Sequence, residues 1–164
     1  GQIVENKMIQ VAGIGAMKGF SVLMTNTVPN LNSIEKSQCF PRYFYEDTTI
    51  SKDKSKQQSH LFTNSTENSK TANLQRRDAI TDEGLDHFKA AYPDEKITKD
   101  DLFYYVYGIL HSEDYRARYA DNLSKELPRI PCVKSSDDFW KFVNAGRELG
   151  HLHVNYETVE PYPV

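Results

Sequence analysis

Three glycines near the start of the chain, in the stretch GIGAMKGF, have the composition of a loop that could cradle a phosphate. A dinucleotide-binding loop requires Gly-x-Gly-x-x-Gly, and a P-loop requires Gly-Lys-Ser/Thr after four spacer residues; neither spacing occurs here. The next residues, FSVLM, have a strand pattern, not that of a helix whose N-terminus would hold phosphate. A glycine-bearing β-hairpin is therefore favoured, and Lys18 and Ser21 at its tip could contact a backbone phosphate or a base edge.

The histidines and paired acids do not form a recognisable reaction centre. His151 and His153 lie two positions apart, so on a helix they point in different directions, and no third ligand stands at metal spacing. No Ser-His-Asp or Cys-His order can be argued from these scattered residues. The acid pairs stand where helix N-termini favour negative charge: Asp100 and Asp101, Glu113 and Asp114, Asp137 and Asp138. The sequence therefore predicts no metal ligand and no catalytic residue in this chain.

Basic side chains give a more specific signal, because several of them lie in one polar segment, residues 46–77. They are Lys52, Lys54, Lys56, Lys70, Arg76 and Arg77. Two interpretations stay open: a solvated loop, or a flexible arm that becomes ordered on a nucleic-acid backbone. Just upstream, in QCFPRYFYE, Arg42 stands beside three aromatic residues, which combines base-edge donors with stacking rings. A strand with one face in the core would have the same composition.

The composition limits the class of protein. With 164 residues, 38% of them hydrophobic and 26% charged, the chain is expected to form one domain with a single core. No apolar run approaches the roughly 20 residues of a membrane span, so we expect no membrane partner. Cys39 and Cys132 are far apart and fit free thiols in a reducing compartment, which predicts a cytoplasmic location. Because the chain opens with Gly1 and enters a strand pattern almost at once, we expect it to be part of a larger protein.

The net charge of −3 is unevenly distributed. Residues 1–80 hold ten Lys and Arg against seven Asp and Glu, whereas residues 81–164 hold ten against sixteen. A bound polyanion is therefore expected on the first half.

The elements that must position these residues divide the chain at two points. Alternating apolar residues predict β-rich structure over 1–45, the segment 46–77 is expected to be a flexible basic loop, and 78–164 has helical spacing. A single α+β domain over 1–164 is predicted, with a small, mainly antiparallel sheet in the N-terminal half followed by a bundle of about four helices. Residues able to cap these helices are Thr81, Thr98, Ser112 and Ser135. The helix after Ser112 is expected to continue to Leu127, and the tyrosines of LFYYVYGIL are expected to lie first of all in the core.

Four long blocks of the sequence resemble the C-terminal target-recognition domain of Type ISP restriction–modification enzymes. They are VAGIGAMKGFSVLMTNTVPNL, QCFPRY, ITKDDLFYYVYGILHSEDYRARYADNLSKELPRIP and DFWKFVNAGRELGHLHVNYE. The resemblance covers nearly the whole chain in order, except residues 46–77. Members of this family are large single polypeptides that join a nuclease, a helicase-like ATPase, an adenine-specific DNA methyltransferase and a specificity domain.

The resemblance implies that this module holds double-stranded DNA beside the methyltransferase domain of the same polypeptide and reads a short asymmetric site. The neighbouring domain would flip out the adenine and methylate it. The chain has no Asn-Pro-Pro-Tyr motif and no Walker motif, so we expect no cofactor and no activity in this part alone. S-adenosylmethionine, ATP and magnesium would belong to the parent, a methyltransferase and ATP-dependent restriction endonuclease.

No family motif fixes which side chains touch DNA, so the candidates are chosen on charge, hydrogen-bonding capacity and expected loop or edge placement. The predicted DNA-binding residues are Lys18, Ser21, Gln38, Arg42, Arg76 and Arg77. A second set consists of helix-surface arginines, Arg116, Arg118, Arg129 and Arg147. Two alternatives remain: a helical module that docks on other domains of the parent without touching DNA, and a standalone enzyme of unknown chemistry.

Overall fold

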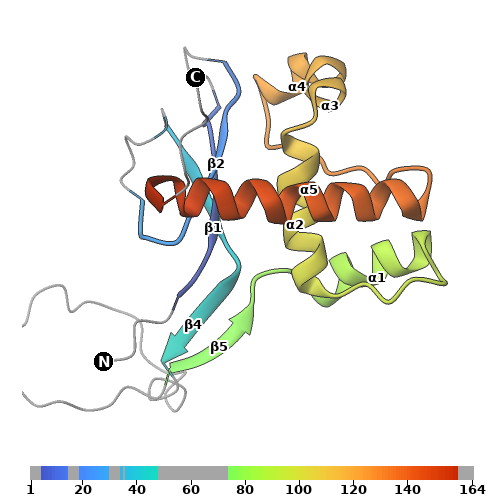
Figure 1. The fold of residues 1–164 in the computed structure, drawn as a ribbon, viewed down its shortest axis with the longest axis horizontal. Coiled ribbons are helices and arrows are strands. Elements are labelled where there is room, and N and C mark those ends of the chain that lie inside the picture. Colours follow the sequence, from blue (N-terminus) through green and yellow to red (C-terminus); the bar gives the residue numbers. More distant parts are fainter. Residues whose placement is uncertain (1–4, 15–18, 30–33, 35, 48–73, 159–164) are drawn as a thin grey trace, which may run out of the picture.

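The computed structural model describes residues 5–14, 19–29, 34, 36–47 and 74–158. Two small antiparallel sheets come first along the chain and helices follow, which confirms the predicted α+β class (Figure 1). The first sheet has the order β2-β1-β3, and the second pairs β4 with β5. The strands are β1 (Met8–Val11), β2 (Val22–Thr25), β3 (Gln38–Pro41), β4 (Tyr43–Asp47) and β5 (Leu74–Asp78).

The three-stranded sheet packs one face on the helices. Ile9 and Val11 of β1 alternate with Gln10, and their cross-strand partners Met24 and Val22 lie on the same face and are also buried. Gln10, on the opposite face, is buried too, and its side-chain amide donates to the Ser37 hydroxyl at 2.7 Å. A polar group in that position therefore keeps a hydrogen-bond partner.

The helical half contains five α-helices and a short 3-10 helix. They are α1 (Asp82–Ala91), α2 (Lys99–Leu110), α3 (Glu113–Arg118), α4 (Ala120–Leu123), α5 (Ser136–Val154) and η2 (Tyr156–Thr158). The four predicted caps are confirmed, since each cap side chain accepts from a backbone N–H of the first turn. The helix expected from Ser112 to Leu127 is instead divided at Tyr119, whose ψ of 18° lies outside the α-helical range, and it ends at Leu123.

Helix α5 runs across α2, and two glycines make this close approach feasible (Figure 1). A Cβ atom on Gly146 would overlap the carbonyl oxygen of Tyr104, and one on Gly108 would overlap that of Phe142. Phe139 of α5 stacks on the ring of Tyr105, with centroids 4.7 Å apart. The aromatic core that we expected on α2 therefore exists, and the backbone contact beside it depends on glycine.

Tyrosine hydroxyls fix the segment that connects α4 to α5. Tyr92, Tyr105 and Tyr115 have buried rings, and their hydroxyls donate to backbone carbonyls of this segment at 2.6–2.8 Å. The acceptors are the carbonyls of Val133, Pro131 and Arg129. Each buried ring thus also holds an irregular stretch of chain in place.

The expected loop over residues 46–77 is wrong at both of its ends. Strand β4 continues through Asp47, and β5 begins at Leu74, so Arg76 and Arg77 lie in a strand. The remainder of that expectation, including Lys52, Lys54, Lys56 and Lys70, lies outside the described residues. Among the described residues, no helix has the length and apolar character to cross a bilayer. Both cysteines are free, Cys39 exposed and Cys132 partly buried.

Candidate nucleic-acid interface

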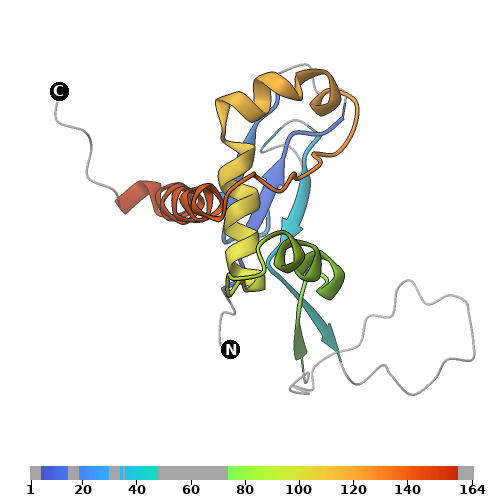
Figure 2. The same cartoon turned by 90° about the vertical axis from the view of Figure 1, so that its right-hand side faces the viewer.

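Strands β4 and β5 form a two-stranded ribbon that extends away from the helices (Figures 1 and 2). Its register pairs Tyr43 with Asp78, Phe44 with Arg77, and Tyr45 with Arg76. Because paired residues share a face and neighbours alternate, the register assigns each side chain to one of two faces. Phe44, Glu46, Gln75 and Arg77 form what we call the outer face, where all four are exposed.

The outer face combines hydrogen-bonding groups with one exposed ring. The Arg77 guanidinium is paired with Glu46 at 3.1 Å, yet the two side chains are 70% and 61% exposed. An ion pair with this exposure contributes little to stability, so both groups can exchange it for other partners at small cost. Phe44 is 49% exposed beside them. This face therefore presents donors, acceptors and an apolar group without obstruction from the helices.

On the opposite face of the ribbon, which we call the inner face, the side chain of Arg76 lies over a tyrosine ring. The Arg76 guanidinium lies 4.4 Å from the centroid of Tyr43, and the Arg42 guanidinium lies at the same distance from that centroid. Stacking of this kind orients a planar guanidinium. Arg76 is exposed, so it combines a fixed orientation with access to solvent.

Arg42, by contrast, is only 6% exposed and lies at the base of the ribbon. Its Nη1 is 2.5 Å from Asp78 and its Nε is 3.3 Å from Asp100. Arg147 of α5 completes the group by pairing with Asp100 at 2.8 Å and Asp101 at 2.7 Å. We call these five residues the ionic hub. This placement does not support the predicted role of Arg42 in base contact. The side chain is buried, and its guanidinium is bound to two carboxylates, those of Asp78 and Asp100.

The hub also shifts the ionisation of its members. Burial acts to raise the pKa of Asp101, but hydrogen bonds from Thr98 and Arg147 and the charge of Arg147 outweigh it and lower that pKa. Burial acts to lower the pKa of Arg147, but the hydrogen bonds that Arg147 donates to Asp100 and Asp101, together with the charges of these two carboxylates, outweigh burial and raise that pKa. Asp101 and Arg147 therefore each stabilise the charged form of the other.

Backbone contacts attach the ribbon at the same place. The Asn6 side chain donates to the Tyr43 carbonyl at 2.7 Å and accepts from the Tyr43 N–H at 3.1 Å. The backbone N–H of Arg42 donates to the carbonyl of Lys7 at 2.8 Å. The ribbon is thus joined to the chain before β1 as well as to α2 and α5.

The remaining candidates do not join the ribbon. Lys18 lies outside the described residues. Ser21 precedes β2, and Gln38 begins β3 as an exposed partner of Val11, which places both at the end of the three-stranded sheet opposite the ribbon. The structure therefore places Arg76 and Arg77 on opposite faces of the same ribbon and separates both from Ser21 and Gln38.

The second set of arginines makes local contacts. Arg116 donates to the Leu110 carbonyl at 2.7 Å, Arg118 lies 5.8 Å from the ring of Tyr119, and Arg129 pairs with Glu126 at 3.2 Å. Arg147 belongs to the ionic hub. None of the four is on the ribbon.

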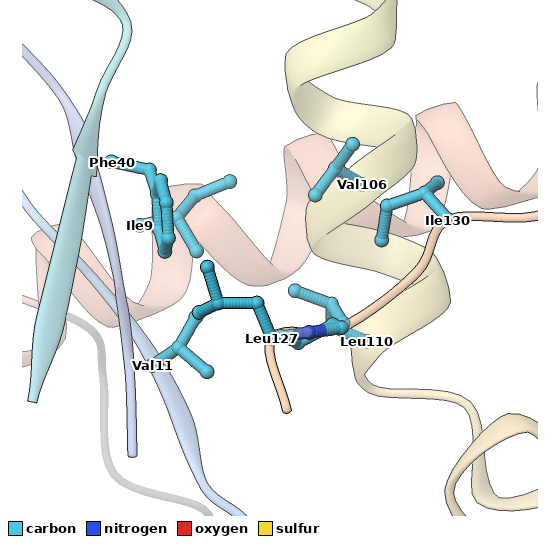
Figure 3. A pocket seen from close by; sticks show the side chains of 8 residues that line it. Ile9, Val11, Phe40, Val106, Leu110, Leu127 and Ile130 are labelled. Atoms are coloured by element: carbon cyan, nitrogen blue, oxygen red, sulfur yellow. The ribbon is translucent and has the colours of Figure 1, made fainter. Parts of the chain in front are cut away.

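An apolar cavity of about 200 Å³ lies between β1, β3, α2 and the segment after α4 (Figure 3). Its lining consists of Ile9, Val11, Phe40, Val106, Leu110, Leu127, Pro128 and Ile130. These residues offer no acid, base or nucleophile. Within the described part of the chain, no three His, Cys, Asp or Glu side chains gather as a metal ion would require.

Sequence reasoning missed Phe44, Glu46 and Gln75 as members of a common surface. Their shared face follows from the pairing of β4 with β5, and no local pattern in LQRRD indicates a strand. The signal that the sequence offers is the aromatic run Tyr43–Tyr45, which favours a strand but does not indicate which side chains share a face.

Comparison with known proteins identifies the family of the chain. The family model of the Type ISP C-terminal specificity domain matches residues 2–164. No curated protein matches the chain. Among solved structures, the DrdV–DNA complex has 37% identity and a TM-score of 0.76, over 98% of this chain and 13% of that one.

Two further solved structures are similar over 99% of this chain. The ATP-dependent Type ISP restriction-modification enzyme LlaBIII bound to DNA has 29% identity and a TM-score of 0.73, with 9% of its chain covered. A nuclease-deletion mutant of the Type ISP enzyme LlaGI, in complex with a DNA substrate mimic, has 30% identity and a TM-score of 0.67, with 11% covered. This chain therefore corresponds to a small part of each of these proteins. It belongs to the family of Type ISP C-terminal specificity domains.

Proposed function

We propose that this chain recognises a specific sequence in double-stranded DNA for a restriction–modification enzyme that works in the cytoplasm. The observation that supports this most directly is the exposed outer face of the ribbon, which carries Arg77, Gln75, Glu46 and Phe44. The similar structures of DrdV, LlaBIII and LlaGI were all solved with DNA or a DNA mimic, which favours a polynucleotide over other ligands.

The dimensions and chemistry of the ribbon suit the major groove. That groove is wide enough to admit a two-stranded β-ribbon, and its base edges differ in donors and acceptors. Arg77 suits the two acceptors of guanine, Gln75 the acceptor and donor of adenine, and Glu46 the amino group of cytosine. Phe44 suits the methyl group of thymine. In this proposal, Arg76 contacts a phosphate at the edge of the groove and fixes the position of the ribbon.

The catalytic steps belong to neighbouring domains in this proposal. An adenine-specific methyltransferase domain of the same polypeptide would flip and methylate the target base, using S-adenosylmethionine. ATP and magnesium would serve the restriction activity of that polypeptide. This chain contributes recognition, so it selects where the reaction takes place and supplies no reacting group.

Reversing the charge of both ribbon arginines tests the proposal. In the full-length polypeptide, Arg76→Glu together with Arg77→Glu should weaken binding to a target duplex by roughly 100-fold or more, because two attractive contacts become repulsive. The matched control reverses Lys125, just after α4, and Lys141 on α5, which are both exposed and belong to the helical half. Equal affinity of the ribbon variant and the control at moderate salt would remove the ribbon from the interface.

A second candidate function is docking on other domains of the parent polypeptide. Phe40 and Leu127 are 41% and 44% exposed at the apolar cavity, and such a surface can receive an apolar side chain (Figure 3). If docking were the only role, DNA affinity would not respond to charge reversal on the ribbon. The same experiment therefore separates the two functions.

A further inference from the structure

Contacts with Arg42, Asn6 and Lys7 join the base of the ribbon to the rest of the domain. We infer that Arg42 is a positioning residue, which sets the angle of the ribbon to the helices and thereby the register in which the outer face meets the base pairs. It does so without touching DNA. This inference rests on the proposed function, because it assigns a role within the same recognition site.

The contacts of Arg42 connect three elements. Asp78 is the last residue of β5, Asp100 lies in the first turn of α2, and the second oxygen of Asp100 is bound by Arg147 of α5. One guanidinium therefore joins the ribbon to the crossing of α2 and α5, where the backbones of the two helices approach closely at Gly108 and Gly146. The crossing of α2 and α5 thus fixes the orientation of the ribbon.

The chemistry of arginine suits this role. Its planar guanidinium has donors in a fixed fork, so the directions to Asp78 and Asp100 are fixed relative to each other. The side chain is 8% exposed, and a buried charge that loses a partner is costly, so the arrangement resists distortion. A lysine carries the same charge on a flexible stem and lacks the fork.

A small change in the angle at the base of the ribbon displaces the residues further along it by a larger distance. Strands rise about 3.4 Å per residue, so the pair Glu46–Gln75 lies roughly 10 Å beyond Tyr43 at the base. A tilt of about 10° would displace that pair by nearly 2 Å, which is about half the 3.4 Å spacing of successive bases along a strand. Hydrogen bonds to base edges do not survive such a shift. Discrimination between sequences would decrease even though every contacting side chain is still present.

The substitution Asp78→Asn should change DNA affinity in opposite directions for the two possible roles of Arg42, positioning the ribbon or contacting DNA itself. If Arg42 bound a phosphate or a base, Asp78 would compete with the DNA, and its neutralisation would strengthen binding. If Arg42 positions the ribbon, the substitution loosens the base, and binding to the target weakens although a negative charge has been removed. We expect about 10-fold weaker binding to the target and no weakening for a non-target duplex.

The measurement uses the full-length polypeptide and two labelled duplexes, one carrying the sequence that this polypeptide modifies and one with that sequence scrambled. Fluorescence anisotropy over a salt series gives the affinity ratio and its salt dependence. Asp121→Asn, an exposed carboxylate on α4, is the charge-matched control. Thermal unfolding verifies that each variant is folded, and Asp100→Asn replaces Asp78→Asn if the latter is not.

Substitutions of Arg42 itself supply a second readout. Removing a phosphate contact lowers the slope of log K against log salt by about 0.9, whereas removing a positioning group leaves the slope unchanged. We therefore expect Arg42→Gln to lower the target-to-scrambled ratio about 10-fold at constant slope. We also expect Arg42→Lys to fail to restore this ratio, although it keeps the charge.

Two results would overturn the inference and leave the proposed function standing, provided that the unaltered polypeptide prefers its target. One is tighter or unchanged target binding by Asp78→Asn, and the other is a reduced salt slope for Arg42→Gln. If the unaltered polypeptide shows no preference between the two duplexes, both the inference and the proposed function fail.

Discussion

Two arginines that the sequence selects equally as DNA-binding candidates have different surroundings in this domain. Arg77 has a 70% exposed side chain in a weak ion pair, whereas Arg42 has an 8% exposed side chain held by Asp78 and Asp100. Exposure allows Arg77 to exchange its partner for a base, and burial prevents Arg42 from doing so. The sequence shows the same charge and hydrogen-bonding capacity for both, so their different roles depend on contacts with residues far along the chain.

Two histidines, His111 and His153, lie beside Tyr107, next to strand β2. The Tyr107 hydroxyl accepts from the Met24 N–H at 2.9 Å and is hydrogen-bonded to His153. The ring of His111 lies 4.7 Å from that of Tyr107. Burial, together with the charge of Arg116 and the neighbouring His153, lowers the pKa of His111 to about 4.

These histidines predict a dependence of stability on pH. The unfolded chain binds a proton at His111 near pH 6.5, whereas the folded chain binds it near pH 4, so acidification between these values favours unfolding. The free energy of unfolding should therefore decrease as pH falls from 6.5 towards 4, by at most about 1.4 kcal/mol per pH unit for one histidine. Denaturant unfolding at several pH values measures this slope.

The substitution His111→Gln should flatten the slope, whereas His87→Gln, at an exposed position on α1, should leave it unchanged. A slope that is equally steep in His111→Gln would show that another group is responsible; the pKa of His153 is also lowered by burial, so it is the next residue to replace.

At the scale of elements, the crossing of α2 and α5 decides whether the helical half can support the ribbon. Gly146→Ala would place a methyl group against the carbonyl oxygen of Tyr104, which belongs to the backbone and cannot rotate away. We expect a loss of roughly 3 kcal/mol in the free energy of unfolding, because the helices must separate. Chemical denaturation measures the change.

Gly84→Ala on α1 is the matched control for this substitution. The added Cβ would meet the Thr81 hydroxyl at 3.4 Å and the Ile80 side chain at 3.9 Å, which are ordinary contact distances, and alanine favours a helix over glycine. It should therefore be neutral or stabilise by about 0.5–1 kcal/mol. Equal stability of the two variants would show that α2 and α5 do not approach as described.

The elements differ in how far the sequence predicts them. Helix starts depend on one side chain and the following turn, so Thr81, Thr98, Ser112 and Ser135 were identified locally. Strand β5 was not, since LQRRD has no alternation of apolar residues and its partner strand ends at Asp47, far upstream. The outer face depends on that pairing, so Arg77 is the one member that the sequence selects as a DNA-binding residue, on its charge, hydrogen-bonding capacity and expected placement in a loop.

At the scale of the whole molecule, the halves have different tasks in the proposed function. The first half carries the excess of basic residues and the second the excess of acidic ones, for a net charge of −3. Such a domain is a poor general binder of polyanions, so recognition should depend on a few correctly placed groups. The helical half then serves as the rigid support on which the ionic hub orients the ribbon.

The central claim is that this chain determines which DNA sequence is recognised, and an exchange of domains tests it most directly. The matching segment of a related enzyme such as LlaGI, 30% identical over 99% of this chain, would be replaced by this one. Modified sites would then be mapped across genomic DNA for the parent enzymes and the hybrid. The account predicts that the hybrid modifies the sequence of the donor of this chain; an active hybrid that still modifies the recipient's sequence would contradict it.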